Sequence, residues 1–130
     1  MTITEQNYVD KAEKVILTLR EQKDNRGKTV PQITTTKIRN LLAMTADIYN
    51  EVLNHTQEKL SEEIAGRIDY LKIRFVYEAG REQAVKYFVE QAQILQAIGE
   101  IQGSRKRFML FNKYMEALVA YHRFHGGKDQ

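Results

Sequence analysis

The sequence contains no cysteine and no tryptophan, and its only proline is Pro31. Without cysteine, disulfide bonds and thiolate metal ligands are excluded. One proline and seven glycines in 130 residues leave few breaks in regular structure, which favours long helices over many short strands. No apolar run approaches the ~20 residues needed to span a bilayer. We therefore expect an all-α protein that has no contact with a membrane.

The amino-terminal segment, M-T-I-T-E-Q-N, lacks the basic flank and the apolar core of a secretory signal peptide. Of the 130 residues, 42% are hydrophobic and 28% are charged, which suits one domain with a filled core and a charged surface. We expect a single cytoplasmic domain spanning residues 1–130, with a loop at 24–33 and a flexible tail at 126–130.

Hydrophobic residues recur at three- and four-residue spacing, which predicts a compact bundle of about five helices. The expected helices are 4–23, 34–54 (beginning at Thr34 or Thr35), 56–80 or 61–80, 82–103 and 104–125. Thr56 and Ser61 are both candidate N-caps for the third of these helices. Gly80 is expected to end it, because glycine adopts the left-handed cap conformation without steric cost.

The formal net charge of +3 is a weak indication of an anionic partner. Positive charge is concentrated at residues 67–81 and 105–130, and the rest of the chain is net acidic. Within the third helix, a spacing of three and four residues places one set of side chains on a single face. This set is Arg67, Tyr70, Arg74 and Tyr77. Arginine donates in a fixed fork to phosphate oxygens and tyrosine stacks on bases. The alternative is a solvated basic face with half-buried tyrosines.

Two further basic clusters each allow a functional and a structural interpretation. Lys37 and Arg39 follow three threonines at a helix start, where a phosphate would meet backbone N–H groups. The plainer interpretation is an N-cap followed by two surface charges, since residues two apart point about 200° apart around a helix. The cations at 105–107 oppose the dipole of the last helix, so either they meet an anion or Glu100 neutralises them.

No pattern in the sequence supports catalysis. There is no serine in a nucleophile elbow, no carboxylate pair in an apolar setting and no G-x-x-x-x-G-K loop. His122 and His125 have the spacing of half a metal site, with only Asp129 available to extend it. We therefore predict no catalytic residue, no metal, no cofactor and no enzyme activity.

Four segments, in order along the chain, resemble the small helical subunit of the type III-A CRISPR effector, the Csm complex. They are Y-V-D-K-A-E at 8–13, T-T-T-K-I-R-N-L-L at 34–42, Y-L-K-I-R-F-V-Y-E-A-G-R-E at 70–82 and Y-M-E-A-L-V-A-Y-H-R-F-H-G-G at 114–127. The resemblance implies a non-catalytic subunit for antiviral defence whose copies stack into a filament. In that family the filament touches target RNA paired to the guide RNA, without reading its sequence. Cleavage and signalling belong to the backbone subunit and the large multidomain subunit.

The resemblance also implies a set of RNA-binding residues and a set of partners. The RNA-binding positions are Lys37, Arg39, Arg67, Lys72, Arg74, Arg81 and Lys86. The implied partners are target RNA, guide RNA, the other Csm subunits and copies of the chain itself. Backbone contacts suit a subunit that serves any guide, because phosphate contacts position a strand without specifying its sequence. Weak contacts from several copies on one strand add through effective concentration.

Two other function classes remain as alternatives. A helical adaptor that binds an acidic protein would show no RNA affinity at low salt. A helix-turn-helix DNA reader would have to present Asn40, Met44 and Asp47, a face that lacks the usual base-reading set of arginine, asparagine and glutamine. The RNA-binding hypothesis fails if Arg67, Arg74 and Arg81 are all locked inward against acidic neighbours and no open electropositive groove remains.

Overall fold

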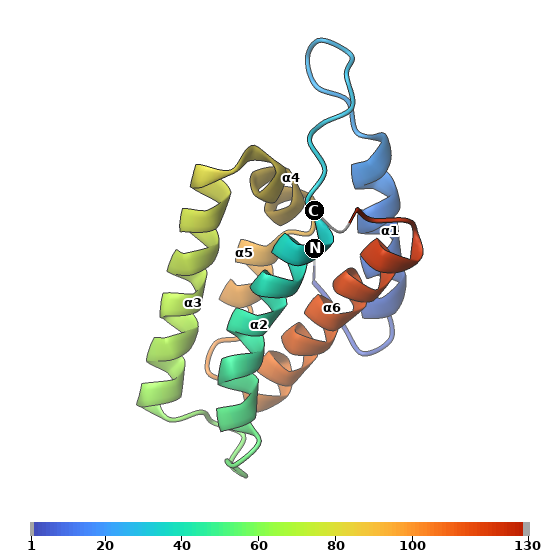
Figure 1. Ribbon diagram of the computed structural model, residues 1–130. Helices are drawn as coiled ribbons and strands as arrows, with labels where there is room; N and C mark the ends of the chain where they lie inside the picture. Colours follow the sequence, from blue (N-terminus) through green and yellow to red (C-terminus); the bar gives the residue numbers. More distant parts are fainter. Residues whose placement is uncertain (1, 129–130) are drawn as a thin grey trace.

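The fold is an all-helical bundle, as the sequence predicts (Figure 1). The computed structural model describes residues 2–128, and within that range it contains six α-helices. These are α1 (Tyr8–Glu21), α2 (Thr35–Val52), α3 (Glu62–Arg81), α4 (Gln83–Gln91), α5 (Ile94–Gly99) and α6 (Arg105–Phe124). None of the helices within residues 2–128 combines the length and the hydropathy of a membrane-spanning segment.

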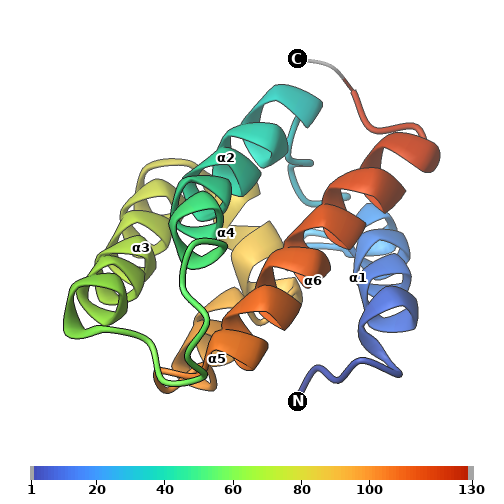
Figure 2. The same ribbon diagram turned by 90° about the horizontal axis from the view of Figure 1, so that it is seen from below.

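The helix α6 occupies the middle of the bundle and packs against α1 and α2. On the other side, α3 packs against α2, α4 and α5. Both views place α2 and α6 between α3 at one margin of the molecule and α1 at the other (Figures 1 and 2). One long face of α3 is therefore left without a helical neighbour.

The apolar stripes predicted from spacing form the core. The inner face of α3 is a typical stripe: Ile64, Ile68, Leu71 and Phe75 are all 5% exposed or less. Tyr114 of α6, to which the sequence pattern gave no role, is fully buried in the same hydrophobic core. Its hydroxyl donates to the carbonyl oxygen of Ala92 at 2.9 Å, so the polar end of this side chain is satisfied inside the core.

Side-chain caps fix the starts of three long helices. The hydroxyls of Thr34, Ser61 and Ser104 accept hydrogen bonds from backbone N–H groups of α2, α3 and α6, at 3.1 to 3.2 Å. Each bond satisfies a first-turn donor that has no partner within the helix. Ser61, rather than Thr56, is thus the N-cap of α3. The first helix begins at Tyr8, later than predicted, because Thr4 and Asn7 hydrogen-bond to each other in a preceding turn.

The fourth expected helix and the predicted end of the third were wrong. The expected helix at 82–103 is divided into α4 and α5 at Gln93, whose φ of 53° is left-handed. Gly80 lies inside α3, which continues to Arg81 and ends because Glu82 is extended, with φ −143° and ψ 119°. Gly103, in contrast, has a φ of 75° at the turn before α6, where the sequence predicts a break.

The predicted loop at 24–33 is partly a hairpin and partly core. Lys23 and Thr29 face each other in an antiparallel bridge, whereas Val30 and Ile33 are each 1% exposed. Of the predicted tail at 126–130, residues 129 and 130 lie outside the described residues. Lys128 is held against α2, since its carbonyl oxygen accepts a hydrogen bond from the Thr35 N–H at 2.6 Å.

Candidate nucleic-acid interface

The face of α3 that turns away from the core combines aromatic, aliphatic and basic side chains. Tyr70, Ile73 and Tyr77 are 59%, 60% and 59% exposed, respectively. Arg74 and Arg81 are exposed beside them on the same side of the helix. Large apolar side chains are seldom this exposed in a row on a monomer, so the face is a candidate contact surface.

The three arginines of α3 differ in how available their charge is. The Arg67 guanidinium lies 2.5 Å from the Glu51 carboxylate, with both side chains 40% exposed. Arg81 lies 3.8 Å from Glu78 and 5.7 Å above the Tyr77 ring centre. Arg74 is exposed and has no carboxylate within salt-bridge distance among residues 2–128. The three are therefore not all locked by acidic neighbours.

An open groove of about 370 Å³ runs between α2 and α3 next to Arg74. Its lining consists of Met44, Asp47, Ile48, Glu63, Gly66, Arg67, Tyr70, Leu71 and Arg74. The lining mixes apolar side chains with groups of both charges. A strand bound at Arg74 would thus run along the rim of a groove rather than over a uniformly basic surface.

Lys37 links two helix ends instead of standing free. Its ammonium group lies 3.8 Å from Glu78 and 3.4 Å from Glu82, so it joins the start of α2 to the end of α3. Arg39, one helical half-turn further, is exposed and has no hydrogen-bond partner among the described residues. The structure therefore separates these two cations, as expected for residues pointing about 200° apart.

The remaining two predicted positions lie apart from the exposed face of α3. Lys72 lines a separate hollow beside Asp69, between α3 and α5. Since it is two residues from Arg74, it points about 200° away from it. Lys86 is exposed on α4, one turn after Glu82. The structure thus brings Arg67, Arg74 and Arg81 to one side of α3 and leaves Lys72 on another.

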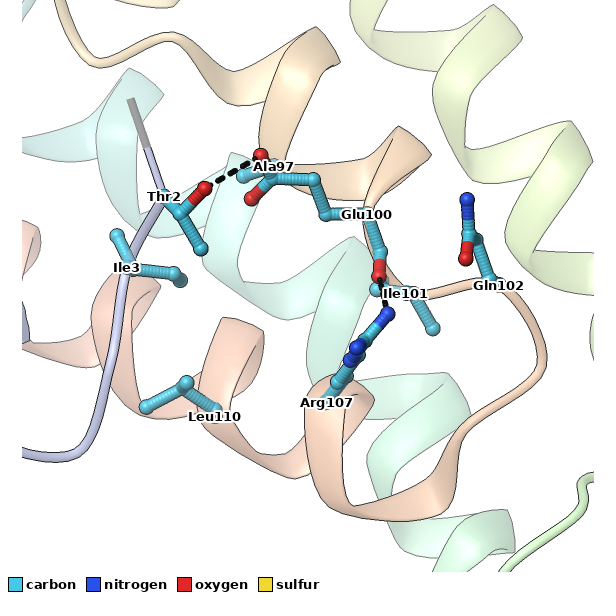
Figure 3. Close-up of a pocket in the computed structure, with 8 residues that line it drawn as sticks. All are labelled: Thr2, Ile3, Ala97, Glu100, Ile101, Gln102, Arg107 and Leu110. Atoms are coloured by element: carbon cyan, nitrogen blue, oxygen red, sulfur yellow. Dashed lines mark hydrogen bonds between the residues drawn. The ribbon is translucent and has the colours of Figure 1, made fainter.

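The first turn of α6 makes several hydrogen bonds to other parts of the protein. The Glu58 carboxylate accepts hydrogen bonds from the Ser104 hydroxyl and from the Lys106 N–H. The Ser104 hydrogen bond lowers the pKa of Glu58, and the N–H and charge of Lys106 act in the same direction. The predicted neutralising residue, Glu100, contributes only its carbonyl oxygen, to which Arg107 donates at 3.0 Å (Figure 3).

Glu58 is the residue that sequence reasoning missed at this site. It lies in the exposed 53–59 segment, far from α6 in sequence, and no local pattern pairs it with Ser104. A neighbouring cavity of about 220 Å³ lies between residues 2–3, α5 and α6 (Figure 3). There the Thr2 hydroxyl donates to the Glu100 carboxylate at 3.0 Å. At the start of α6, the Glu58 carboxylate and the Ser104 hydroxyl thus accept from the backbone N–H groups of Lys106 and Arg107, which an external phosphate would otherwise meet.

The two histidines near the carboxyl end have separate structural contacts. His122 is 6% exposed, and its Nε2 lies 2.7 Å from the Ile33 carbonyl oxygen. Burial lowers the pKa of His122, and the charges of Arg20 and Arg123 lower it further. His125 instead lies 2.8 Å from the Glu13 carboxylate. Within residues 2–128, no group of three histidine or carboxylate side chains is placed to hold a metal ion.

Comparison with known proteins gives consistent matches along the whole chain. The model of a protein family described as Csm2 Type III-A matches residues 13–128 of the chain. A Streptococcus thermophilus protein named CRISPR system Cms protein Csm2 is 46% identical over 127 residues, covering 98% of each chain. A protein of the same name from Mycobacterium tuberculosis (strain H37Rv) is 38% identical over 130 residues and 100% of both chains. One from Enterococcus italicus is 38% identical over 120 residues, 88% of this chain and 86% of the relative.

Proposed function

Because the chain belongs to the Csm2 family, the small subunits of type III-A CRISPR Csm complexes, we propose that it binds RNA there by the strand's backbone. In this proposal the chain contributes positive charge and exposed aromatic rings and leaves the sequence information to base pairing between guide and target. Such a subunit is a cytoplasmic, non-catalytic part of the complex. This function requires cations that no internal carboxylate has neutralised.

The proposal rests mainly on the exposure of Arg74 and on the absence of a carboxylate partner for it among the described residues. It is an exposed arginine between Tyr70 and Tyr77, and no carboxylate of the described residues lies within salt-bridge distance of it. A guanidinium in this position donates to phosphate oxygens while the neighbouring rings stack on bases of any identity. Arg67 and Arg81 extend the same side, although each shares its charge with a glutamate.

The aliphatic part of the α3 face supports a second contact, with a neighbouring copy of the chain. Ile73 and Val76 are 60% and 51% exposed, and phosphate contacts do not require apolar side chains. Their burial against another subunit would remove apolar surface from water, at about 25 cal/mol per Å². We propose that stacked copies bury this strip, so that their arginines line one continuous track for RNA.

The direct test compares Arg74→Ala with Lys14→Ala, which removes another exposed cation, from α1. Full-length protein is titrated into labelled single-stranded RNA at low salt, and binding is followed by fluorescence anisotropy. Arg74→Ala should weaken binding about three- to tenfold, since it removes one phosphate contact, whereas Lys14→Ala should not. Equal affinities of the parent and the Arg74→Ala variant would contradict the proposal.

A further inference from the structure

Residues 22–30 follow α1 and lead into the buried part of the loop before α2, and they fold as a closed hairpin. The Asp24 N–H donates to the Lys28 carbonyl oxygen at 2.8 Å, and the Val30 N–H donates to that of Gln22 at 3.0 Å. At the tip, Gly27 has a φ of 77°, a conformation that favours glycine. We call residues 22–30 the basic hairpin.

The only carboxylate of the basic hairpin is used inside it. Asp24 Oδ1 accepts hydrogen bonds from the Arg26 N–H at 2.8 Å and from the Lys28 N–H at 3.0 Å. These bonds hold the tip in one shape, and they turn the carboxylate towards the backbone of the turn. The negative charge is thus committed to the turn, and the hairpin's lysine and arginine side chains are not paired with it.

The cations of the basic hairpin are consequently exposed and unneutralised. Lys23, Arg26 and Lys28 are all exposed, and none has a carboxylate within salt-bridge distance among the described residues. Lys23 donates to the Thr29 hydroxyl at 3.0 Å, which leaves it charged. This differs from α3 and α2, where Arg67, Arg81 and Lys37 each have a glutamate partner.

The base of the basic hairpin is fixed to the bundle, while its tip stands clear of it (Figure 1). The Gln32 amide donates to the carbonyl oxygens of Leu19 and Val30, both at 2.9 Å, and Val30 itself is 1% exposed. The chain then enters α2, whose first turns carry Lys37 and Arg39. Figure 1 places the hairpin at the end of the molecule where α3 finishes and α4 starts. Arg81 and Lys86 therefore lie at the same end.

We propose that the basic hairpin is a second RNA-binding element, which contacts phosphates of the strand beyond those held at α3. This inference rests on the proposed RNA-binding function and adds a site to it. A pre-shaped hairpin loses little conformational entropy when its cations meet a polyanion, so each contact retains more of its electrostatic gain. Its ligand is the phosphate backbone, because the tip offers cations and no apolar or aromatic side chain for a base.

The test uses a triple variant, Lys23→Ala, Arg26→Ala and Lys28→Ala, in the full-length chain. The matched control is Lys14→Ala, Lys59→Ala and Lys106→Ala, which removes the same net charge from exposed positions elsewhere. The probe is a labelled oligouridine of about 30 nucleotides, titrated at several salt concentrations. Losing three phosphate contacts on a single strand should reduce the slope of log affinity against log salt by about 2 and weaken binding at least about tenfold at low salt.

The outcomes separate this inference from the function it rests on. A reduced slope in the hairpin variant and an unchanged slope in the control support the proposal. Equal losses in both triple variants would mean that only net charge matters, and would overturn it. If the hairpin variant binds like the parent while Arg74→Ala binds more weakly, the hairpin proposal fails and the proposed function stands. Loss of subunit assembly with unchanged RNA affinity would assign the hairpin to a protein contact and also overturn the proposal.

Discussion

At the scale of single residues, the surface cations divide by what they touch. Lys37, Arg67 and Arg81 each have a glutamate within 3.8 Å, so a phosphate has to compete with that carboxylate. Arg39 and Arg74 have no such partner among the described residues. The Arg67–Glu51 pair, 40% exposed on both sides, is of the exposed kind that contributes only about 0–1 kcal/mol to stability.

His122 gives a prediction about pH at the same scale. Its pKa lies below the ordinary value of 6.5, because burial and two nearby arginines disfavour the charged ring. Below about pH 6.5 the unfolded chain therefore binds a proton that the folded chain does not. The free energy of unfolding should fall by up to about 1 kcal/mol between about pH 7.5 and pH 5.5 through this residue. Urea denaturation at the two pH values measures the loss.

The control is His122→Gln, whose amide is also able to donate to the Ile33 carbonyl oxygen but does not titrate. The stability of this variant should fall less than that of the parent over the same pH range. An identical pH dependence in the parent and His122→Gln would show that the buried ring does not control acid stability.

At the scale of elements, local sequence predicts helices and caps but not what distant segments impose. The stripes of α1 to α3 and the cap Ser104 were predictable, because amphipathic spacing and capping act within a few residues. Ser61 was one of two candidate caps, and the structure decides between them. The break between α4 and α5 was not predictable. It lies at Gln93, beside the carbonyl oxygen of Ala92 that Tyr114 binds from α6, and this contact spans 22 positions in sequence.

Tyr114→Phe tests this tertiary support of the α4–α5 break. The substitution keeps the ring packing and removes the hydroxyl, leaving the Ala92 carbonyl oxygen buried with one hydrogen bond fewer. We expect a loss of about 1–2 kcal/mol in the free energy of unfolding, measured by urea denaturation. Tyr77→Phe, at an exposed site of α3, serves as the comparison and should change stability by less than about 0.5 kcal/mol. If the parent and Tyr114→Phe have equal free energies of unfolding, the Tyr114 hydrogen bond does not support the break between α4 and α5.

The candidate site shows the same division between local and distant information. The shared face of Arg67, Tyr70, Arg74 and Tyr77 follows from helical spacing, and the structure displays it as an exposed surface. The neutralisation of Lys37 by Glu78 and Glu82 depends on how α2 meets the end of α3, which spacing along one helix does not encode. The basic hairpin was predicted only as a loop. Its Asp24 hydrogen bonds are local, whereas the Gln32 hydrogen bond to Leu19, 13 positions away, is not encoded by neighbouring residues.

At the scale of the whole molecule, a modest net charge of +3 conceals an uneven distribution. The end that carries the basic hairpin also carries the first turns of α2, the last turn of α3 and the first turn of α4 (Figure 1). At the start of α6, by contrast, the Glu58 carboxylate accepts a hydrogen bond from the Lys106 backbone N–H, and the Arg107 guanidinium donates to the Glu100 carbonyl oxygen. If the proposed RNA binding holds, this uneven distribution would provide a basic side for the strand without the high overall charge of a stand-alone RNA-binding protein.

Sequence-indifferent binding to the RNA backbone is the central claim, and salt titration of two RNAs tests it most directly. The affinity of the full-length chain for oligouridine and oligoadenosine of equal length is measured from low to moderate salt. The account predicts straight lines of log affinity against log salt with similar slopes, and affinities within about tenfold of each other. No binding to either RNA at low salt, or a larger preference for one of them, would contradict it.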